Sequence, residues 1–99
     1  MLRPKCIWLD GYARKACRAL KRRLEPLGYR VICKSELPDK LIDKLALEWG
    51  CVVVTGDRHF AERPVHRAAW IYLPRRLAER RSSAKLATKI IKMVFTRRP

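Results

Sequence analysis

The sequence predicts an α/β fold, a three-layer α/β/α sandwich in which helices cover both faces of a mainly parallel four-stranded sheet. Short apolar runs at 6–9, 29–33, 51–55 and 69–73 are typical of buried strands. Segments with apolar residues at helical spacing separate or follow these runs. Strands that alternate with helices are joined by right-handed crossovers, so they run parallel with helices on both sides. We expect residues 1–99 to form a single domain, because this length is within the usual range for one domain.

The first part of the chain supplies two strands and a helix. The strand at 6–9 stops at Asp10, which a glycine follows. The helix expected at 12–27 has alanine, leucine and cysteine on one face and lysine and arginine on the opposite face. Gly28 is a stop signal for this helix, and the strand at 29–33 begins directly after it.

A second helix is expected to open at Asp39 and to end at Gly50. Its expected inner face consists of Leu41, Ile42, Leu45, Ala46 and Trp49. The run at 51–55 that follows is continuous and rich in β-branched residues. Such a run is typical of a strand in the middle of a sheet.

The last part of the chain supplies one strand and one helix. A turn or short helical piece at 56–62 leads to the strand at 69–73, which Pro74 ends. Ser82 or Ser83 can cap the final helix. The apolar stripe expected to be buried on that helix is Leu86, Ala87, Ile90, Ile91, Val94 and Phe95.

Charge is strongly unbalanced, since 24 Lys and Arg face nine Asp and Glu and the net charge is +15. A field of this sign concentrates polyanions, so nucleic acid is the leading class of partner. No apolar run approaches the ~20 residues of a membrane span, and the beginning of the chain lacks the pattern of a signal peptide. We therefore expect a cytoplasmic protein with no membrane partner. High charge content without Asn or Gln is typical of a thermophile.

The four cysteines, Cys6, Cys17, Cys33 and Cys51, show no C-x-x-C spacing of a zinc or redox motif. Three fall in expected strands and Cys17 falls on the apolar face of a helix. We expect unbonded, buried side chains that pack as small hydrophobes. A disulfide between neighbouring strands is the alternative, and a hyperthermophilic source would favour it, because intracellular disulfides do occur there.

Three segments of the chain form a specific combination. They are Ile7-Trp8-Leu9-Asp10, then Leu27-Gly28-Tyr29-Arg30-Val31, then the stretch from Asp39 to Phe60, which ends in a strand followed by Thr55-x-Asp57-x-x-Phe60. This combination, which spans about residues 6–73, resembles the small PIN-like family of the PIN-domain nucleases. The resemblance implies a compact α/β/α sandwich. The wider superfamily includes the toxins of many prokaryotic toxin–antitoxin pairs.

The resemblance also implies a ribonuclease in which a quartet of acids holds one or two Mg²⁺ or Mn²⁺ ions and activates water to cut RNA. By position in the motif, the implied catalytic and metal ligands are Asp10 at the first strand, Asp39 at the second helix and Asp57 in the Thr-x-Asp element. Members often carry a further acid where this chain has His59. They also often have Asp-Glu-Asn at the first strand, where a glycine and a tyrosine follow Asp10 here.

The residues themselves allow the same chemistry. Carboxyl ends of parallel strands share one edge of a sheet, and ligands bind there. Two or three carboxylates offset the charge of Mg²⁺ and leave positions for a phosphate oxygen and a nucleophilic water. Each aspartate also has a structural alternative: Asp10 as a turn residue, and Asp39 and Asp57 as helix caps.

Several residues are assigned auxiliary roles. Asp43 lies one helical turn after Asp39 and is either a further ligand or the solvated partner of neighbouring lysines. Thr55 is expected to orient a carboxylate or a water. His59 is either a general acid or base or a plain polar loop residue, and so is His66.

Basic and aromatic residues supply the expected RNA contacts. The expected phosphate-binding residues are Arg14, Arg18, Arg58, Arg75 and Arg76. Tyr12, close to Asp10, is expected to stack a base. The three tryptophans, Trp8, Trp49 and Trp70, lie in or beside apolar segments and are expected in the core.

Three functions remain open from the sequence. The first is a PIN-like Mg²⁺- or Mn²⁺-dependent ribonuclease. The second is a catalytically inactive PIN-like RNA-binding subunit of a ribonucleoprotein. The third is the toxin half of a toxin–antitoxin pair, neutralised by a small acidic protein partner. Monomer and homodimer are both open.

Overall fold

The centre of the protein is a four-stranded sheet, seen in a computed structural model that describes residues 4–34, 36–61 and 65–96. The strands are β1 (Cys6–Leu9), β2 (Arg30–Ile32), β3 (Cys51–Thr55) and β4 (Ala69–Tyr72), in the order β2-β1-β3-β4. All three neighbouring pairs are parallel. The predicted α/β class and the four predicted strands are confirmed.

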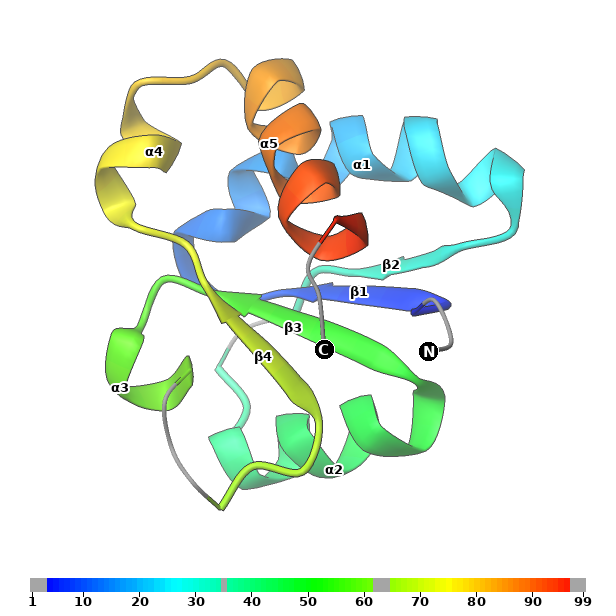
Figure 1. Cartoon of the computed structure of the whole chain (residues 1–99), viewed down its shortest axis with the longest axis vertical. Helices are drawn as coiled ribbons and strands as arrows, with labels where there is room; N and C mark the ends of the chain where they lie inside the picture. The colour runs from blue at the N-terminus through cyan, green and yellow to red at the C-terminus, as the bar shows by residue number, and fades with distance from the viewer. Residues whose placement is uncertain (1–3, 35, 62–64, 97–99) are drawn as a thin grey trace.

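Helices cover both faces of this sheet, as the sandwich prediction requires (Figure 1). On one face lie α1 (Cys17–Leu24) and α5 (Ser83–Phe95), and on the other lies α2 (Asp39–Trp49). Two short helices, α3 (Arg58–Ala61) and α4 (Arg75–Glu79), follow the carboxyl ends of β3 and β4. Loops and helix starts therefore gather at the carboxyl edge of the sheet.

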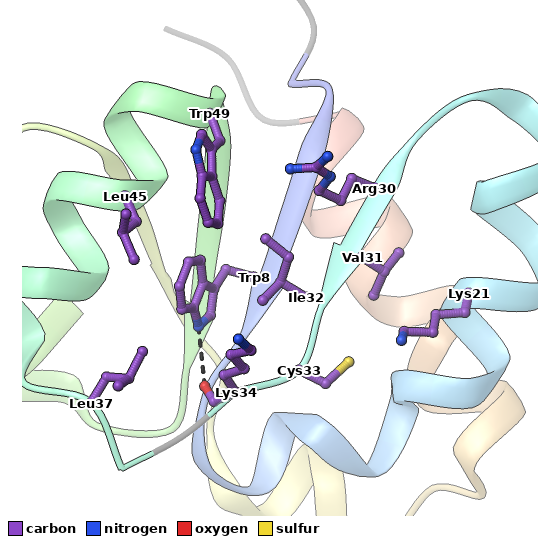
Figure 2. A pocket seen from close by; sticks show the side chains of 10 residues that line it. All are labelled: Trp8, Lys21, Arg30, Val31, Ile32, Cys33, Lys34, Leu37, Leu45 and Trp49. Carbon is purple, nitrogen blue, oxygen red and sulfur yellow. Dashed lines mark hydrogen bonds between the residues drawn. The ribbon is translucent and has the colours of Figure 1, made fainter.

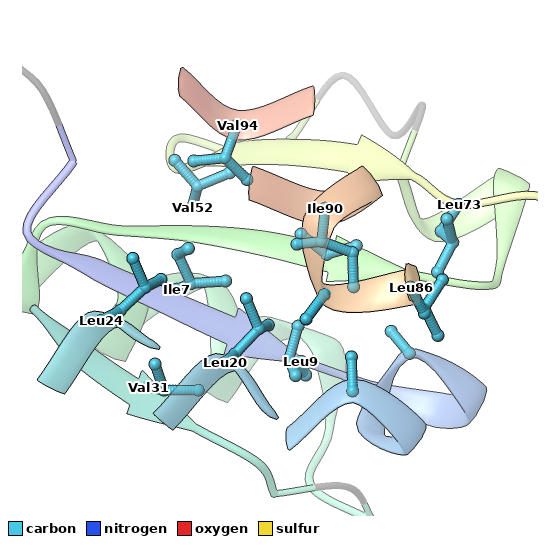
Figure 3. Packing of buried hydrophobic residues seen from close by; sticks show 14 of the residues in the cluster. Ile7, Leu9, Leu20, Leu24, Val31, Val52, Leu73, Leu86, Ile90 and Val94 are labelled. Carbon is cyan, nitrogen blue, oxygen red and sulfur yellow. The ribbon is translucent and has the colours of Figure 1, made fainter. Parts of the chain in front are cut away.

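The core has two halves because successive strand side chains point to opposite faces. Ile7 and Leu9 of β1 pack with α1 and α5 in the larger cluster, part of which Figure 3 shows. Cys6 and Trp8 of the same strand pack against α2 in the smaller one. Both β1 and β3 are buried along their whole length, which explains their unbroken apolar sequences.

The helix expected at 12–27 is divided into three pieces. A 3₁₀ segment, η1 (Gly11–Ala16), precedes α1, and a second one, η2 (Glu25–Leu27), follows it. Pro26 has no N–H to donate, so the α-helical bonding pattern cannot continue through it. Gly28 ends the whole segment with φ 93°, in the left-handed conformation expected of a stop signal.

Helix α4 was not predicted. Pro74 was interpreted as the end of a strand, but it also stands at the N-cap of α4. Proline is favoured at a helix start, because its fixed φ suits the first turn and its missing N–H is not needed there. The final helix begins as predicted, with the Ser82 hydroxyl accepting the N–H of Lys85 at 3.2 Å.

The inner face of α2 differs from the prediction. Ile42 and Ala46 are buried as expected, but Leu41 is 39% exposed and Trp49 is 43% exposed. Asp43 is only 9% exposed and takes a place on the buried side. The helix is therefore rotated relative to the expected apolar stripe, and an acid faces inward.

The expectation of unbonded cysteines was wrong, because all four form disulfides. Cys6 and Cys51 are register partners on β1 and β3, with Cα atoms 4.2 Å apart, so the alternative of a bond between neighbouring strands holds for this pair. Cys17 and Cys33 join the start of α1 to the segment after β2. Within the described ranges, no helix combines the length and the apolar character needed to cross a bilayer.

Candidate functional site

A hollow of about 390 Å³ opens at the carboxyl edge of the sheet, where β1 and β3 end side by side. It is lined by Asp10, Gly11, Tyr12, Thr55, Gly56, Asp57 and Arg58. Two of the three predicted ligands, Asp10 and Asp57, therefore share one site, together with the predicted auxiliary Thr55. We call this set the aspartate hollow.

Thr55 connects the two aspartates of the hollow. Its hydroxyl donates a hydrogen bond to Asp10 Oδ2 at 3.2 Å, and its oxygen accepts the backbone N–H of Asp57 at 3.1 Å. The Asp10 backbone N–H donates to the carbonyl of Val54 at 2.9 Å, which continues the pairing of β1 with β3 beyond the last residue of β1. The expected contact of Thr55 with a carboxylate is thus present, and it positions that carboxylate.

Asp57 also organises the short helix that follows it. Its Oδ1 accepts the backbone N–H of His59 at 2.9 Å, and its carbonyl accepts the N–H of Ala61 at 3.0 Å. These contacts are those of a helix N-cap, so the structural alternative given for Asp57 is realised. His59 contacts Asp57 through its main chain, its side chain is exposed, and it does not line the hollow.

The third predicted ligand, Asp39, is placed differently. It lies in the first turn of α2, is half-buried and is not one of the residues that line the aspartate hollow. Pro38, not Asp39, is the N-cap of α2. Among the described residues there is no group of three or more His, Cys, Asp or Glu side chains that could hold a metal ion. The three predicted ligands are thus not assembled into one cluster in this conformation.

The aspartate hollow nevertheless has the donor chemistry of a weak magnesium site. Its potential side-chain ligands are all oxygens, from two carboxylates and two hydroxyls. Mg²⁺ prefers oxygen ligands, keeps several waters and is commonly bound by one or two carboxylates together with substrate phosphates. Asp10 and Asp57 therefore fit Mg²⁺ or Mn²⁺ held jointly with a phosphate-bearing substrate.

Tyr12 forms one wall of the hollow. Its hydroxyl lies 2.9 Å from the carbonyl oxygen of Gly56 and 3.0 Å from that of Leu73, so its single proton is shared between them. A Cβ at Gly56 would come within 2.2 Å of the Tyr12 ring. Burial raises the pKa of Tyr12, and the nearby Tyr72 adds to this, so the hydroxyl stays protonated near neutral pH. Stacking of a base on this ring stays a prediction.

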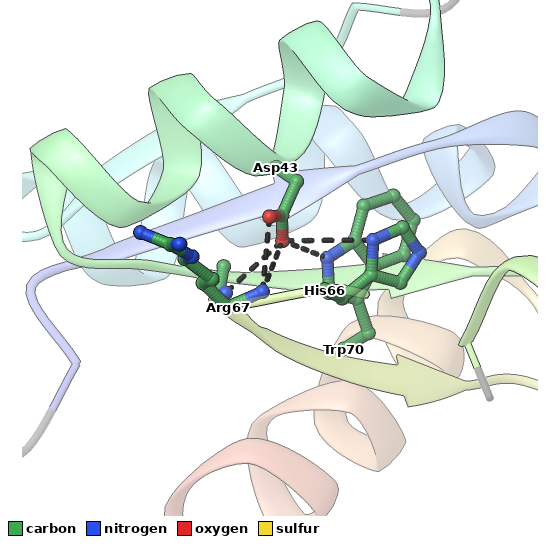
Figure 4. A network of polar contacts seen from close by, with 5 residues as sticks. Asp43, His66, Arg67 and Trp70 are labelled. Carbon is green, nitrogen blue, oxygen red and sulfur yellow. Dashed lines mark hydrogen bonds and ion pairs between the residues drawn. The ribbon is translucent and has the colours of Figure 1, made fainter. Parts of the chain in front are cut away.

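Asp43 does not take part in the aspartate hollow. Its carboxylate accepts the backbone N–H groups of Arg67 at 3.0 Å and Ala68 at 3.0 Å and the indole N–H of Trp70 at 2.8 Å (Figure 4). His66 Nδ1 lies 3.7 Å from the same carboxylate, and its ring stacks on Trp70. The expectation of a solvated partner of lysines was wrong: Asp43 ties α2 to the segment that enters β4.

This environment sets the ionisation of Asp43. Burial alone would raise the pKa of its carboxyl, but the backbone N–H of Arg67, the indole of Trp70, the N–H of Ala68 and the neighbouring His66 together hold the pKa below its ordinary value of 3.8. His66 lies in the loop before β4, as one of its two alternatives predicted, but it is a packed residue and not a solvated one. Its side chain is 5% exposed, and its ring centroid is 4.0 Å from that of Trp70.

The predicted phosphate-binding arginines are all exposed, but only Arg58 lines the aspartate hollow. Arg14 lies beside it and donates through Nε to the carbonyl of Gly11 at 3.2 Å. Arg75 forms an exposed ion pair with Glu79 at 2.8 Å. Arg18 and Arg76 lie on α1 and α4 without entering the hollow.

Comparison with known proteins identifies no relative. No family model matches the chain, and searches of curated proteins and of solved structures found no significant match. The resemblance to the PIN-like family therefore stays an expectation from the sequence motifs quoted above.

Proposed function

We propose that this protein is a metal-dependent ribonuclease of PIN-like type. The observation that carries the proposal is the joint placement of Asp10 and Asp57 in one hollow at the carboxyl edge of the sheet, connected through the Thr55 hydroxyl. The chain carries a net charge of +15, which favours a polyanionic substrate such as RNA. The PIN-like motifs support the same reaction.

Each residue of the hollow has a role in this proposal. Asp10 and Asp57 would hold Mg²⁺ or Mn²⁺, which when bound lowers the pKa of a water and offsets charge on the phosphate. Thr55 keeps the Asp10 carboxylate in place. Arg58 binds a phosphate next to the scissile one, and the Tyr12 ring borders the sugar and base.

Cleavage of a 5′-labelled single-stranded RNA with Mg²⁺, with Mn²⁺ and with EDTA tests the proposal. We expect cleavage only with metal, and its loss in Asp10→Asn and in Asp57→Asn. Glu25→Gln is the matched control, because it removes one carboxylate charge from an exposed position outside the hollow. Equal cleavage by wild type and both aspartate variants would show that the hollow is not the active site.

An RNA-binding protein without cleavage is the second candidate, and one observation favours it. The described residues contain no three-ligand metal group, and both carboxylates of the hollow already accept hydrogen bonds from the protein. In this case RNA binds equally well in Mg²⁺ and in EDTA and remains intact. Cleavage gained by His59→Asp would then mark the site as a degenerate nuclease centre.

We place either function in the cytoplasm of a thermophile. Two disulfides are unusual in a reducing cytosol, but they are common in intracellular proteins of hyperthermophiles. We also propose that an acidic protein partner could bind the exposed arginines, where it would compete with RNA.

A further inference from the structure

A second hollow, of about 460 Å³, lies away from the aspartate hollow, between β2 and α2 (Figure 2). Since β2 is an edge strand, this hollow follows one border of the sheet. Its lining includes the apolar side chains of Trp8, Ile32, Leu37, Leu45 and Trp49. We call this hollow the tryptophan groove.

The two tryptophans of the groove have different exposures. Trp8 is 1% exposed and donates its indole N–H to the carbonyl of Lys34 at 3.1 Å, so it forms a fixed floor. Trp49 is 43% exposed, and its ring stacks on that of Trp8 with centroids 6.1 Å apart and planes 19° apart. The expectation that Trp49 is a core residue was therefore wrong. A large aromatic surface is instead held in place and left open to solvent.

Three cationic residues line the tryptophan groove. The Arg30 guanidinium lies 5.6 Å from the centroid of the Trp49 ring, and Lys21 and Lys34 also line the groove. None of the lining residues that the structure describes is acidic. The groove thus combines an exposed aromatic ring with a local positive field, and it fits a planar group attached to an anion.

We propose that the tryptophan groove binds an unpaired base of single-stranded RNA, with the base stacked on Trp49 and the adjoining phosphates held by Arg30 and Lys34. Aromatic rings inside cationic grooves bind single strands this way, because every base has a face that can stack. A second copy of this chain is a poor occupant, since each copy carries +15 and like charges would meet in the groove. The inference shares the RNA partner of the proposed function but does not depend on cleavage.

Binding without metal separates the groove from catalysis. The probe is a fluorescein-labelled, mixed-sequence single-stranded RNA of about 12 nucleotides, measured by anisotropy in EDTA. We expect Trp49→Ala to weaken binding by about 5- to 100-fold, and Trp49→Phe, which keeps a ring, to recover most of it. Leu47→Ala is the matched control, because Leu47 is 50% exposed on the same helix and does not line the groove.

Salt dependence separates stacking from charge. Trp49→Ala should leave the slope of log affinity against log salt unchanged, whereas Arg30→Ala should reduce it by about 1. Thermal melts of each variant show whether it is folded, and Arg30→Ala keeps the test valid if Trp49→Ala is not folded, because an unchanged salt slope in Arg30→Ala would also reject the groove.

Three outcomes would overturn the inference, each in a recognisable way. Unchanged affinity of folded Trp49→Ala, when wild type binds RNA, rejects the groove and leaves the proposed ribonuclease intact. Absence of RNA binding by wild type rejects both the RNA-binding groove and the proposed ribonuclease. A dimer in sedimentation that Trp49→Ala dissociates, with RNA affinity unchanged, shows that the groove joins two copies instead. Groove-dependent binding without cleavage under any metal supports the inference and rejects the ribonuclease.

Discussion

The Thr55 hydroxyl donates a hydrogen bond to Asp10 Oδ2 over 3.2 Å, across the ends of two neighbouring strands. The same oxygen accepts the N–H of Asp57 at 3.1 Å, so one atom contacts both residues that bring a carboxylate to the hollow. Thr55 is 1% exposed, and water therefore competes little for these bonds. Thr55, the last residue of β3, thus holds the two aspartates in position relative to each other.

Thr55→Val tests this arrangement, because valine keeps the shape and removes the hydroxyl. We expect metal-dependent RNA cleavage to fall about 10- to 100-fold, as is typical when the support of a ligand is removed. The free energy of unfolding should fall by about 1 kcal/mol, since the partly buried hydrogen bond from the Asp57 N–H to the Thr55 hydroxyl is lost. Single-turnover cleavage and urea unfolding measure the two effects.

Thr88→Val is the control for this substitution, because the Thr88 hydroxyl bonds to Arg23 and to the carbonyl of Ala84, both exposed contacts on α1 and α5. It should leave cleavage unchanged. Full activity of Thr55→Val would mean that Asp10 needs no such support.

Gly56→Ala should damage the hollow through its Tyr12 wall. The added methyl would lie 2.2 Å from the Tyr12 ring, so the ring must move and its hydroxyl must leave the carbonyls of Gly56 and Leu73. Such overpacking typically costs about 1–3 kcal/mol. We expect a lower melting temperature and weaker cleavage.

A double substitution identifies the cause. Tyr12→Ala removes the ring, so Gly56→Ala should cost much less stability in that background. The loss of stability in the double variant should therefore be smaller than the sum of the losses in the two single variants. Equal costs of Gly56→Ala with and without the tyrosine ring would contradict the proposed contact.

The sheet could be predicted from the sequence because its strands carry strong local signals. The run 51–55 is apolar on both faces, as a central strand must be, and it pairs with β1 and β4. Asp10 and Asp57 could be placed at one edge for the same reason, since each follows a strand that runs in the same direction. Asp39 could not, because its position depends on the rotation of α2 about its own axis.

Because of the same rotation, the burial of Asp43 and the exposure of Trp49 could not be predicted from the sequence. An inward-facing acid on α2 is stabilised by groups 24–27 residues further along the chain, and no local pattern indicates such partners. The disulfide Cys6–Cys51 likewise depends on strand register, which brings residues 45 positions apart opposite each other. Contacts between residues this far apart in the sequence cannot be predicted from the local spacing of residues.

Asp43→Asn should destabilise the protein at neutral pH. The amide has one acceptor oxygen where the carboxylate has two, so the N–H groups of Arg67 and Ala68 and the Trp70 indole lose part of their acceptor capacity. We expect a loss of about 1–3 kcal/mol in the free energy of unfolding, measured with urea. Glu48→Gln is the control, since Glu48 lies exposed on the same helix.

Asp43 should also make stability depend on pH. The folded state lowers its pKa below 3.8, so the unfolded chain binds the proton more readily. Its contribution is therefore complete above the unfolded pKa and is lost as the pH falls through the folded value. Urea midpoints from pH 6 down to about pH 2 should show a smaller acid loss in Asp43→Asn than in wild type. Parallel profiles would contradict this role.

The two disulfides should differ in their reaction with a reductant under native conditions. Cys17 and Cys33 are half-buried, whereas Cys6 and Cys51 are 1% and 4% exposed. A phosphine reductant followed by alkylation and mass spectrometry should label the first pair well before the second, because a sulfur must be reached to be attacked. Labelling of any cysteine without reductant would contradict the pairing.

Loss of the Cys17–Cys33 bond should also lower stability, because the bond closes a loop in the unfolded chain over a sequence separation of 16. A loop of this size corresponds to about 3 kcal/mol. The free energy of unfolding of Cys17→Ala/Cys33→Ala, measured with urea, should therefore be lower than that of wild type by about 3 kcal/mol. The same reductant pulse should shift wild type toward the variant and leave the variant unchanged, since its remaining bond is buried between β1 and β3.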